Sequence, residues 1–174
     1  MNEGGTPLRI SNIGTKLNLK TLRIKDETRN PTTTFMDRGT TAEISVCKWL
    51  GPIDPKYVIV GNVVGGLAVS LAAYSARAAF ECQLFVQRNQ GWGLSPNILY
   101  QLIRYSAKIN LTSKNFVLPD NYYKFNYNNT FFVEGLKTIG FEICDQFGCE
   151  LPDHIIVPMG RVHIYMQYIV PSSK

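Results

Sequence analysis

The order in which strand-like and helix-like segments follow one another most constrains the fold of this chain. Short apolar runs that suit buried strands alternate with longer segments whose apolar residues recur at helical spacing. Strands are predicted at 22–25, 57–60, 83–86, 108–111 and 154–157, and helices at 35–50, 67–79, 96–105 and 134–147. Such alternation predicts an α/β fold made of open, mostly parallel sheets with helices on both faces, joined by right-handed crossovers.

Two of the predicted helices have recognisable ends and faces. Thr34 is placed to cap the helix at 35–50, and the Gly-Pro pair at 51–52 ends it. The predicted apolar face of this helix consists of Ala42, Val46, Trp49 and Leu50. The helix at 134–147 carries an apolar stripe of Leu136, Ile139, Ile143 and Phe147, with Gly148 as its stop. The segment at 120–130, rich in Asn and Tyr, is predicted to be a loop.

Composition and charge narrow the class of protein. The 174 residues suit one domain, or one domain plus part of another, and 45% hydrophobic with 18% charged residues indicates a globular chain. The formal charge is +5, but Lys and Arg are spread along the chain instead of forming one basic stripe, which argues against nucleic-acid binding. Part of this charge could instead attract a small anionic ligand or an anionic partner.

The cysteines and the hydrophobic segments indicate the cellular compartment of the protein. The spacing of Cys47, Cys82, Cys144 and Cys149 fits no metal motif, so these residues are expected to be thiols in a reducing cytosol. No basic-then-apolar leader is visible at the start, and the apolar run at 67–80 is too short and too polar to span a bilayer. We therefore expect a cytoplasmic protein with no metal and no membrane contact.

Three stretches could carry chemistry. Thr32, Thr33 and Thr34 precede a helix start, where hydroxyls and free backbone N–H groups can bind an anion, although an ordinary capped helix start is the favoured interpretation. The glycine-rich turn at 61–66 lacks the G-x-G-x-x-G spacing, so it is as plausible a tight connection as a phosphate cradle. Arg161 follows a predicted strand end, where it could meet an anion or simply face solvent.

Taken together, these stretches resemble one family. Residues 25–39 read Lys-Asp-Glu-Thr-Arg-Asn-Pro-Thr-Thr-Thr-Phe-Met-Asp-Arg-Gly, which is similar to the Lys-Asp-Glu-x-x-Asn-Pro-Thr-Gly-Ser-Phe-Lys-Asp-Arg-Gly segment of threonine synthases. Further collinear similarity covers 4–8, 71–78, 134–143 and 151–158. The chain thus resembles the threonine-synthase branch of the fold-type-II pyridoxal-phosphate enzymes, in the tryptophan-synthase-β-like superfamily. This resemblance implies a small domain at roughly 35–120 and an incomplete large domain built from 1–34 and 121–174.

The departures from that family fall at its chemical positions. Met36 stands where the family has the lysine that forms a Schiff base with the cofactor, and a thioether cannot form an imine or carry a proton. The family's Ser-x-Gly-Asn loop, which holds the cofactor ring, aligns with residues 63–66 and so with Gly65 and Gly66. Its phosphate-cupping Gly-Asn-Gly-Gly loop aligns with residues 160–163, where only Gly160 is kept and Arg161 follows.

These departures predict weak or absent pyridoxal-phosphate binding. Losing two or three hydrogen bonds to a charged group, at roughly 1.5–3 kcal/mol each, would weaken binding by roughly 3–9 kcal/mol. Compared with the family, only residues 161–174 follow the loop glycine, so apolar surface is expected to be covered by rearrangement or by association. A homodimer or a complex with an intact relative is the expected partnership.

Three functional hypotheses remain open. The first is a truncated, catalytically inactive threonine-synthase-like protein with a non-enzymatic role. The second is a related enzyme, acting on O-phosphohomoserine, that holds pyridoxal phosphate through another lysine, with Lys25 the nearest along the motif. The third is a non-catalytic anion-binding or interaction protein. The predicted cofactor-binding residues, all in the degenerate loops, are Gly65, Gly66 and Gly160. The predicted substrate- or anion-binding residues are Thr32, Thr34, Arg38 and Arg161.

Overall fold

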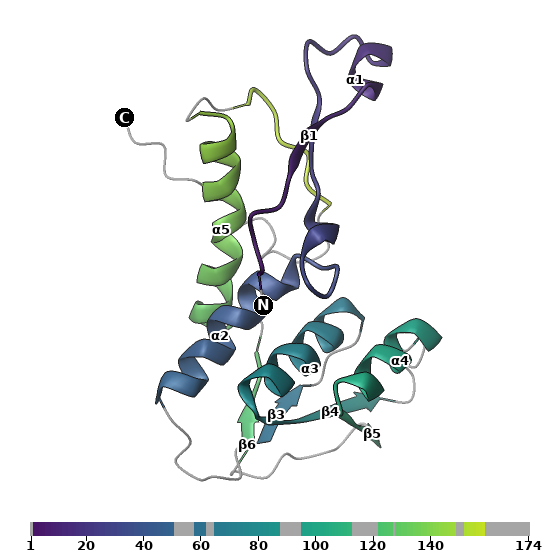
Figure 1. The fold of residues 1–174 in the computed structure, drawn as a ribbon, viewed down its shortest axis with the longest axis vertical. Coiled ribbons are helices and arrows are strands. Elements are labelled where there is room, and N and C mark those ends of the chain that lie inside the picture. Colours follow the sequence, from purple (N-terminus) through teal and green to yellow (C-terminus); the bar gives the residue numbers. More distant parts are fainter. Residues whose placement is uncertain are drawn as a thin grey trace.

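The structure, a computed structural model, describes most of the chain. The described residues are 2–50, 58–61, 65–87, 95–112, 122–126, 128–148 and 152–158. They form an α/β arrangement of two small open sheets and their helices, as Figure 1 shows.

A four-stranded parallel sheet forms one end of the molecule. Its strands are β3 (Val58–Gly61), β4 (Glu81–Gln87), β5 (Lys108–Thr112) and β6 (Tyr122–Lys124), in the order β5-β4-β3-β6. β3 lies at the centre, with Val60 opposite Gln83 of β4 on one side and Lys124 of β6 on the other. The carboxyl ends of all four strands therefore point the same way, toward the start of the next helix.

The helices that connect these strands lie on one face of the sheet. α3 (Gly66–Ala78) joins β3 to β4, and α4 (Pro96–Arg104) lies between β4 and β5, both on the same side in Figure 1. Two successive right-handed crossovers that step in the same direction place both helices on the same face. From β5 the chain returns across the sheet to β6, and this connection lies outside the described residues. The expected coverage of both sheet faces by helices therefore stays a prediction.

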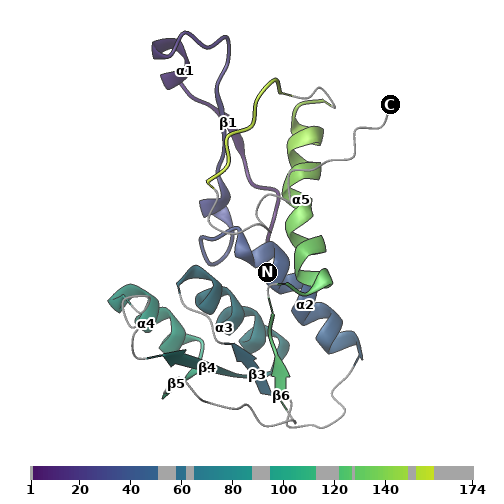
Figure 2. The same ribbon diagram turned by 180° about the vertical axis from the view of Figure 1, so that it is seen from behind.

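Two further helices extend the layer that α3 begins. α2 (Met36–Leu50) packs against α3 on one side and against α5 (Thr130–Gln146) on the other (Figure 2). The α2–α5 approach depends on glycine, because a Cβ built on Gly135 would lie 2.3 Å from the Arg38 carbonyl oxygen and 2.9 Å from the Gly39 Cα. Since real Cβ atoms do not come so close to backbone, neither helix could hold this position with a side chain at Gly135.

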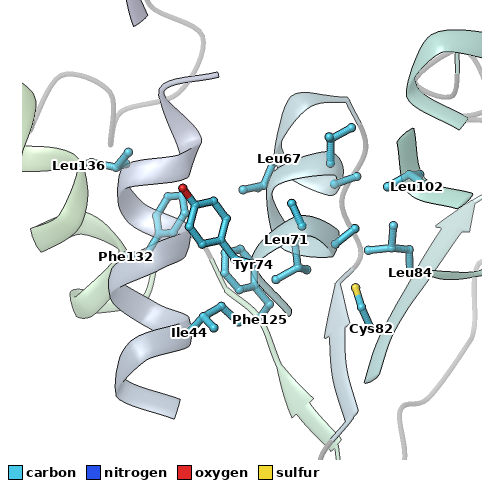
Figure 3. Close-up of a cluster of buried hydrophobic side chains, with 14 residues drawn as sticks. Ile44, Leu67, Leu71, Tyr74, Cys82, Leu84, Leu102, Phe125, Phe132 and Leu136 are labelled. Atoms are coloured by element: carbon cyan, nitrogen blue, oxygen red, sulfur yellow. The ribbon is translucent and has the colours of Figure 1, made fainter. Parts of the chain in front are cut away.

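The hydrophobic core joins these helices to the sheet (Figure 3). Leu71 of α3, Leu84 of β4 and Leu136 of α5 are fully buried in one cluster. The alanines of α3 let it lie close to its neighbours, and Phe125 meets Phe132 edge-to-face with ring centroids 5.4 Å apart. The core therefore runs continuously from β4 through α3 to α5.

The N-terminal arm, defined here as residues 8–25, lies at the opposite end from the four-stranded sheet (Figures 1 and 2). It contains β1 (Leu8–Ile10), the single helical turn α1 (Ile13–Lys16) and β2 (Arg23–Lys25). β1 and β2 pair antiparallel, with Leu8 opposite Lys25. A 3₁₀ turn, η1 (Glu27–Arg29), then leads the chain toward α2.

Most of the predicted elements are confirmed. β2 to β5 and α2 to α4 lie within two residues of their predicted bounds. α5 starts at Thr130, four residues before its predicted start, because Asn129 caps it by accepting a hydrogen bond from the Phe131 N–H at 2.9 Å. Its predicted stripe is confirmed at Leu136, Ile139 and Ile143, all buried, while Phe147 is half-buried.

Two predictions about elements are wrong. The predicted loop at 120–130 contains β6, whose tyrosines suit a strand that pairs with β3. The predicted buried strand at 154–157 has no strand structure, and Ile156 is 92% exposed. An apolar run forms a buried strand only if a neighbouring strand pairs with it, and no described strand pairs with this one.

The predicted apolar face of α2 is wrong at the end of the helix. Trp49 and Leu50 are 84% and 68% exposed, whereas Ala42 and Val46 are half-buried. The buried side is partly polar instead and contains Thr40, Glu43, Ile44 and Cys47. Polar residues with specific partners, described below, outweigh apolar periodicity in this helix.

The close contact of α2 and α5 predicts the effect of Gly135→Ala. The added methyl group must displace the α2 backbone, so we expect a loss of about 2 kcal/mol in the free energy of unfolding, measured by urea denaturation. Asp145→Ala, on the exposed side of the same helix, is the matched control and should change it by less than about 0.5 kcal/mol. An alanine variant as stable as the wild type would contradict the helix approach described here.

Candidate functional site

The loop before α2 is held by the first turn of that helix. The buried Asp37 carboxylate accepts hydrogen bonds from the backbone N–H of Thr32, at 2.7 Å, and from the Thr32 hydroxyl. Thr34 Oγ1 accepts from the Met36 N–H at 3.3 Å, which is the capping contact predicted for this threonine. The Thr32 hydroxyl proton is thus already donated to Asp37, whereas the half-buried Thr34 remains accessible at the helix start.

Thr33 in the same loop has an unfavourable backbone conformation. Its φ is +61°, in the left-handed region where a β-branched residue is a genuine outlier. Its N–H donates to the Asn30 carbonyl at 2.8 Å, so the turn fixes this geometry. The threonine-synthase segment described above has glycine at this place, which adopts such a φ without steric cost.

The start of α3 lies against this loop. A Cβ built on Gly66 would be 3.2 Å from Thr34 Oγ1 and 3.3 Å from its Cβ, so the glycine permits the contact. Gly65 precedes the helix with φ +69° and provides no side-chain cap. The first N–H groups of any α-helix have no partner within it and carry partial positive charge. The structure therefore brings together three of the predicted site residues, Thr34, Gly65 and Gly66.

Met36 begins α2 beside this junction. Its side chain is half-buried and packs against the hydrophobic core. A thioether offers no amine, so the described part of the site does not fit a covalently held pyridoxal phosphate. The predicted phosphate-loop residues Gly160 and Arg161 lie outside the described residues.

Arg38 is buried in a network of acidic groups instead of facing the Thr34 junction. Its guanidinium is 2% exposed, and it pairs with Glu27 Oε2 at 2.7 Å and with Glu142 Oε1 at 2.7 Å. It also donates to the hydroxyls of Thr138, at 3.0 Å, and of Thr6, at 3.1 Å. The anion-binding role predicted for Arg38 stays a prediction, and the partners it has here are carboxylates of its own chain.

Lys25 belongs to the same network. Its ammonium group donates to the Thr6 carbonyl at 2.7 Å, to Glu142 Oε2 at 2.8 Å and to Gln146 Oε1 at 3.0 Å. An ammonium group has three N–H donors, so all of them are used. Gly5 adds its N–H to Glu142 at 2.8 Å, which ties the N-terminal segment to α5.

The two carboxylates of this network have lowered pKa values. Burial alone would raise the pKa of Glu142, but hydrogen bonds from Arg38 and Lys25 outweigh it and lower the pKa to about 2. Burial opposes the shift in Glu27 as well, and hydrogen bonds from Arg38 and Thr6 lower its pKa. A depressed carboxyl pKa stabilises the fold above the ordinary value of 4.5, and this contribution is lost as the pH falls toward the folded-state pKa.

A second buried carboxyl group, Glu43 of α2, was missed by sequence reasoning. Its side chain is fully buried, and Oε1 accepts from the Tyr123 hydroxyl at 2.8 Å and from Asn129 Nδ2 at 3.2 Å. Oε2 has no hydrogen-bond partner in the described part of the chain. Burial raises the pKa of Glu43 to about 7, against the lowering effect of these hydrogen bonds. A lone glutamate in a helix gives no sequence signal of such burial.

The structure also bears on metal binding, on the cysteines and on membrane insertion. Among the described residues, no group of three His, Cys, Asp or Glu side chains is placed to hold a metal ion. The Cys47 and Cys82 side chains are buried, and that of Cys144 is half-buried. The described helices include none that is both long and apolar enough to cross a membrane.

Comparison with known proteins identifies relatives of this fold and sequence. The model of the family described as pyridoxal-phosphate dependent enzyme matches residues 1–164. The chain is 37% identical to a threonine synthase of Methanocaldococcus jannaschii, over 91% of this chain and 40% of that protein. It is 30% identical to a threonine synthase of Methanosarcina acetivorans, over 92% of this chain and 41% of that protein. The chain thus spans less than half the length of these relatives.

Solved structures show the same fold at low sequence identity. A fungal L-serine ammonia-lyase from Rhizomucor miehei superposes with a TM-score of 0.82 and 16% identity, over 95% of this chain and 54% of that one. The diaminopropionate ammonia lyase of Escherichia coli, in its apo form, gives a TM-score of 0.75 and 13% identity, over 95% of this chain and 55% of that one. These matches show that the described residues adopt about half of a fold used by such enzymes.

The conformation of Thr33 predicts that Thr33→Gly stabilises the protein. Glycine relieves a left-handed strain of roughly 1–2 kcal/mol but costs roughly 0.5–1 kcal/mol in unfolded-chain entropy. We expect a net gain of up to about 1 kcal/mol in the free energy of unfolding, measured in urea. Thr41→Gly, inside α2, is the control of opposite sign and should cost roughly 0.3 kcal/mol. Destabilisation of equal size at both positions would contradict the strain at Thr33.

The buried Glu43 predicts a pH-dependent stability that Glu43→Gln abolishes. Because the folded-state pKa is raised, the native state keeps the proton that the unfolded state releases near 4.5, so stability falls as the pH rises from about 4.5 to about 7. Glutamine stays neutral, and at pH 8 we expect the variant to be roughly 3 kcal/mol more stable than the wild type, with little difference at pH 4.5. Glu134→Gln, at an exposed position, is the control. Parallel stability curves for Glu43→Gln and wild type between pH 4.5 and 8 would refute the raised pKa.

Proposed function

Because this chain belongs to the family of pyridoxal-phosphate dependent enzymes, we propose that it is a threonine-synthase-like member that lacks catalytic activity and keeps the scaffold. The observation that carries the proposal is Met36, a core-packed thioether at the start of α2. Pyridoxal phosphate, when bound in such enzymes, acts as an electron sink and is held covalently by a lysine amine. No amine lies at this place.

The contacts of the neighbouring residues support a scaffold role. Asp37 and Arg38, which follow Met36, are the same residues as in the family motif. Both make buried contacts that hold the chain together. Asn30 likewise donates to Glu27 and accepts from the Gly4 N–H at 3.0 Å. The motif residues that build the fold are thus present, whereas the residue that performs the chemistry is not.

The alternative in which Lys25 replaces the missing lysine has less support. Its ammonium group makes three hydrogen bonds, and one of them is an ion pair with Glu142. Attack on an aldehyde needs a neutral amine that is free to move, so this lysine would first have to break all three contacts. Removing it would also leave Glu142 with fewer partners.

A second, non-catalytic function has one observation in its favour. Thr34 meets the start of α3 at Gly66, where a hydroxyl and the backbone N–H groups at a helix start can receive a small anion. Thr32 and Arg38 are engaged elsewhere, so an anion here would depend on Thr34 and the helix start. Calorimetry with inorganic phosphate, on wild type and on Thr34→Val, tests this function, and equal heats for the two proteins would rule it out.

The inactive-scaffold proposal predicts different labelling of wild type and Met36→Lys. After incubation with pyridoxal phosphate, borohydride reduction and dialysis, we expect no stoichiometric pyridoxyl adduct on any wild-type lysine by peptide mass mapping. Met36→Lys restores an amine beside Thr34 and Gly66, and we expect an adduct at residue 36 of that variant. Lys48→Met, at the far end of α2, controls for random surface labelling. A stoichiometric adduct at Lys25 of the wild type would overturn the proposal in favour of the enzyme hypothesis.

A further inference from the structure

Glu43 of α2 is hydrogen-bonded through only one of its two oxygens. Its side chain is fully buried, and every described hydrogen bond reaches Oε1. The donors are the Tyr123 hydroxyl at 2.8 Å, Asn129 Nδ2 at 3.2 Å and the Asn126 N–H at 3.4 Å. Oε2 is equally buried and has no hydrogen-bond partner in the described part of the chain.

This one-sided hydrogen bonding suits a neutral carboxylic acid. In the acid, Oε1 is the carbonyl oxygen that accepts hydrogen bonds, and Oε2 carries the proton. In the ionised form, Oε2 would share a negative charge without any donor, and an unpaired buried charge costs much more than an unpaired O–H. The partial positive charge at the start of α5 favours the ion, but this effect is smaller than the lost hydration. Burial accordingly raises the pKa of Glu43 to about 7.

The surrounding titratable groups do not neutralise a charge on Glu43. The Tyr123 hydroxyl and the Cys47 thiol hydrogen-bond each other, and a charge on Glu43 raises the pKa of both groups. The other titratable and charged groups on the elements around Glu43 have partners of their own or are exposed. Lys48 donates to the Ala78 carbonyl, Glu134 pairs with Lys137, Tyr74 bonds Glu3, Asp37 bonds Thr32, Arg38 pairs with Glu142, and Arg77, Lys124 and Asp145 are exposed.

The donors to Glu43 come from one part of the chain, at the junction of β6 and α5. Tyr123 lies in β6, which leads up to the start of α5 beside α2 (Figure 2). Asn129 caps α5 through its side-chain oxygen, while its Nδ2 donates both to Glu43 and to the Tyr123 hydroxyl, the latter at 3.0 Å. Glu43 therefore holds the end of β6 and the cap of α5 against α2 at the same time.

This junction can open while the rest of the fold stays closed. β6 has three residues and, in the described part of the chain, pairs with β3 alone. Its apolar anchor is Phe125, which is buried edge-to-face against Phe132. α5 is fixed independently near its far end by the pair of Arg38 and Glu142. Segments with few contacts of this kind open at a lower free energy than the core around them.

We propose that Glu43 acts as a proton-operated latch between α2 and the junction of β6 and α5. The neutral acid holds Tyr123 and Asn129 in place. When the O–H bond of Oε2 breaks and the proton passes to water, the carboxylate gains hydration only if the junction opens, so ionisation favours the open form. Cys47 lies one helical turn after Glu43 and is buried in the closed form, and opening exposes its thiol to solvent.

Thiol labelling with a dipyridyl disulfide, followed by peptide mass mapping, tests the latch. Wild type and Glu43→Gln are labelled at pH 4.5 and at pH 8, and each cysteine's rate is divided by its rate in the urea-unfolded chain. The pKa of Glu43 is about 7 in the closed form, against an ordinary value of 4.5 in the open form. Each pH unit between these values is worth tenfold in the opening equilibrium, so the ratio of Cys47 rates, wild type to variant, should rise by up to about 300-fold.

Cys82 of β4 is the internal control for global unfolding. It is buried, and β4 lies on the opposite side of β3 from β6. At pH 8 we expect wild-type Cys47 to react at least tenfold faster than Cys82. Its rate should hardly change below about 1 M urea, whereas the rate of Cys82 should rise, because only global unfolding exposes much new surface.

Tyr123→Phe removes one donor to Glu43 and keeps the ring. We expect Cys47 of this variant to react faster than in the wild type even at pH 4.5, where the acid is neutral. Tyr100→Phe, at an exposed position on α4, is the matched control and should leave the rate unchanged.

Three results would overturn the latch. The first is a rise of less than tenfold in the ratio of Cys47 rates between pH 4.5 and 8. The second is an equal rate and an equal urea dependence for Cys47 and Cys82 in the wild type, which would show that the chain opens only as a whole. The third is an equal effect of Tyr123→Phe and Tyr100→Phe. The second comparison needs the wild type alone, so it decides even if glutamine at position 43 disturbs the fold.

Discussion

The burial of one guanidinium group between two carboxylates holds the separate parts of this structure together. Arg38 stands in the first turn of α2, Glu27 in η1 and Glu142 near the end of α5, so the pairs join segments up to 104 residues apart. Removing one partner of such a buried pair typically costs about 3–5 kcal/mol, since a buried charge is left uncompensated. The N-terminal segment, the loop before α2 and α5 all depend on this network for their relative position.

That dependence explains why position 36 can differ from the family motif without loss of the fold. The motif at 25–39 contains residues that hold the fold together and one, Met36, that does not, and their contacts distinguish the two kinds. Asn30, Asp37 and Arg38 make buried hydrogen bonds, so their replacement would leave unsatisfied polar groups. The Met36 side chain packs against the core, and a flexible methionine side chain adapts readily to such a position. Stability therefore constrains the neighbours of Met36 much more strongly than Met36 itself.

The backbone of the loop before α2 is likewise determined by the buried contacts around it. Thr33 keeps a left-handed φ that suits glycine, because Asn30 and Asp37 fix the turn on either side of it. The local cost of roughly 1–2 kcal/mol is smaller than the cost of breaking the buried network around it. The network thus imposes the turn on a residue that does not favour it.

Sequence reasoning identified the elements and the family because these depend on local pattern and on collinear motifs. It located Thr34, Gly65 and Gly66, which the structure places together, from a capping position and a glycine turn. It could not assign the partners of Arg38, because Glu142 is 104 residues away and nothing local marks it. The burial of Glu43 was hidden for the same reason, since its donors Tyr123 and Asn129 lie in a segment predicted to be loop.

The same physical argument distinguishes the two ends of the molecule. At the four-stranded sheet, the apolar side chains of α3 from Leu67 to Tyr74 are buried in the hydrophobic core. At the arm, the charged contacts of Lys25 and Arg23 fix one face of β1–β2, and Ile24 on the other face is 49% exposed. Charge pairs between segments can position a strand pair, yet they bury little apolar area and contribute little of the driving force for folding. The strand pair is consequently positioned by charged contacts, whereas α3 is positioned by buried apolar area.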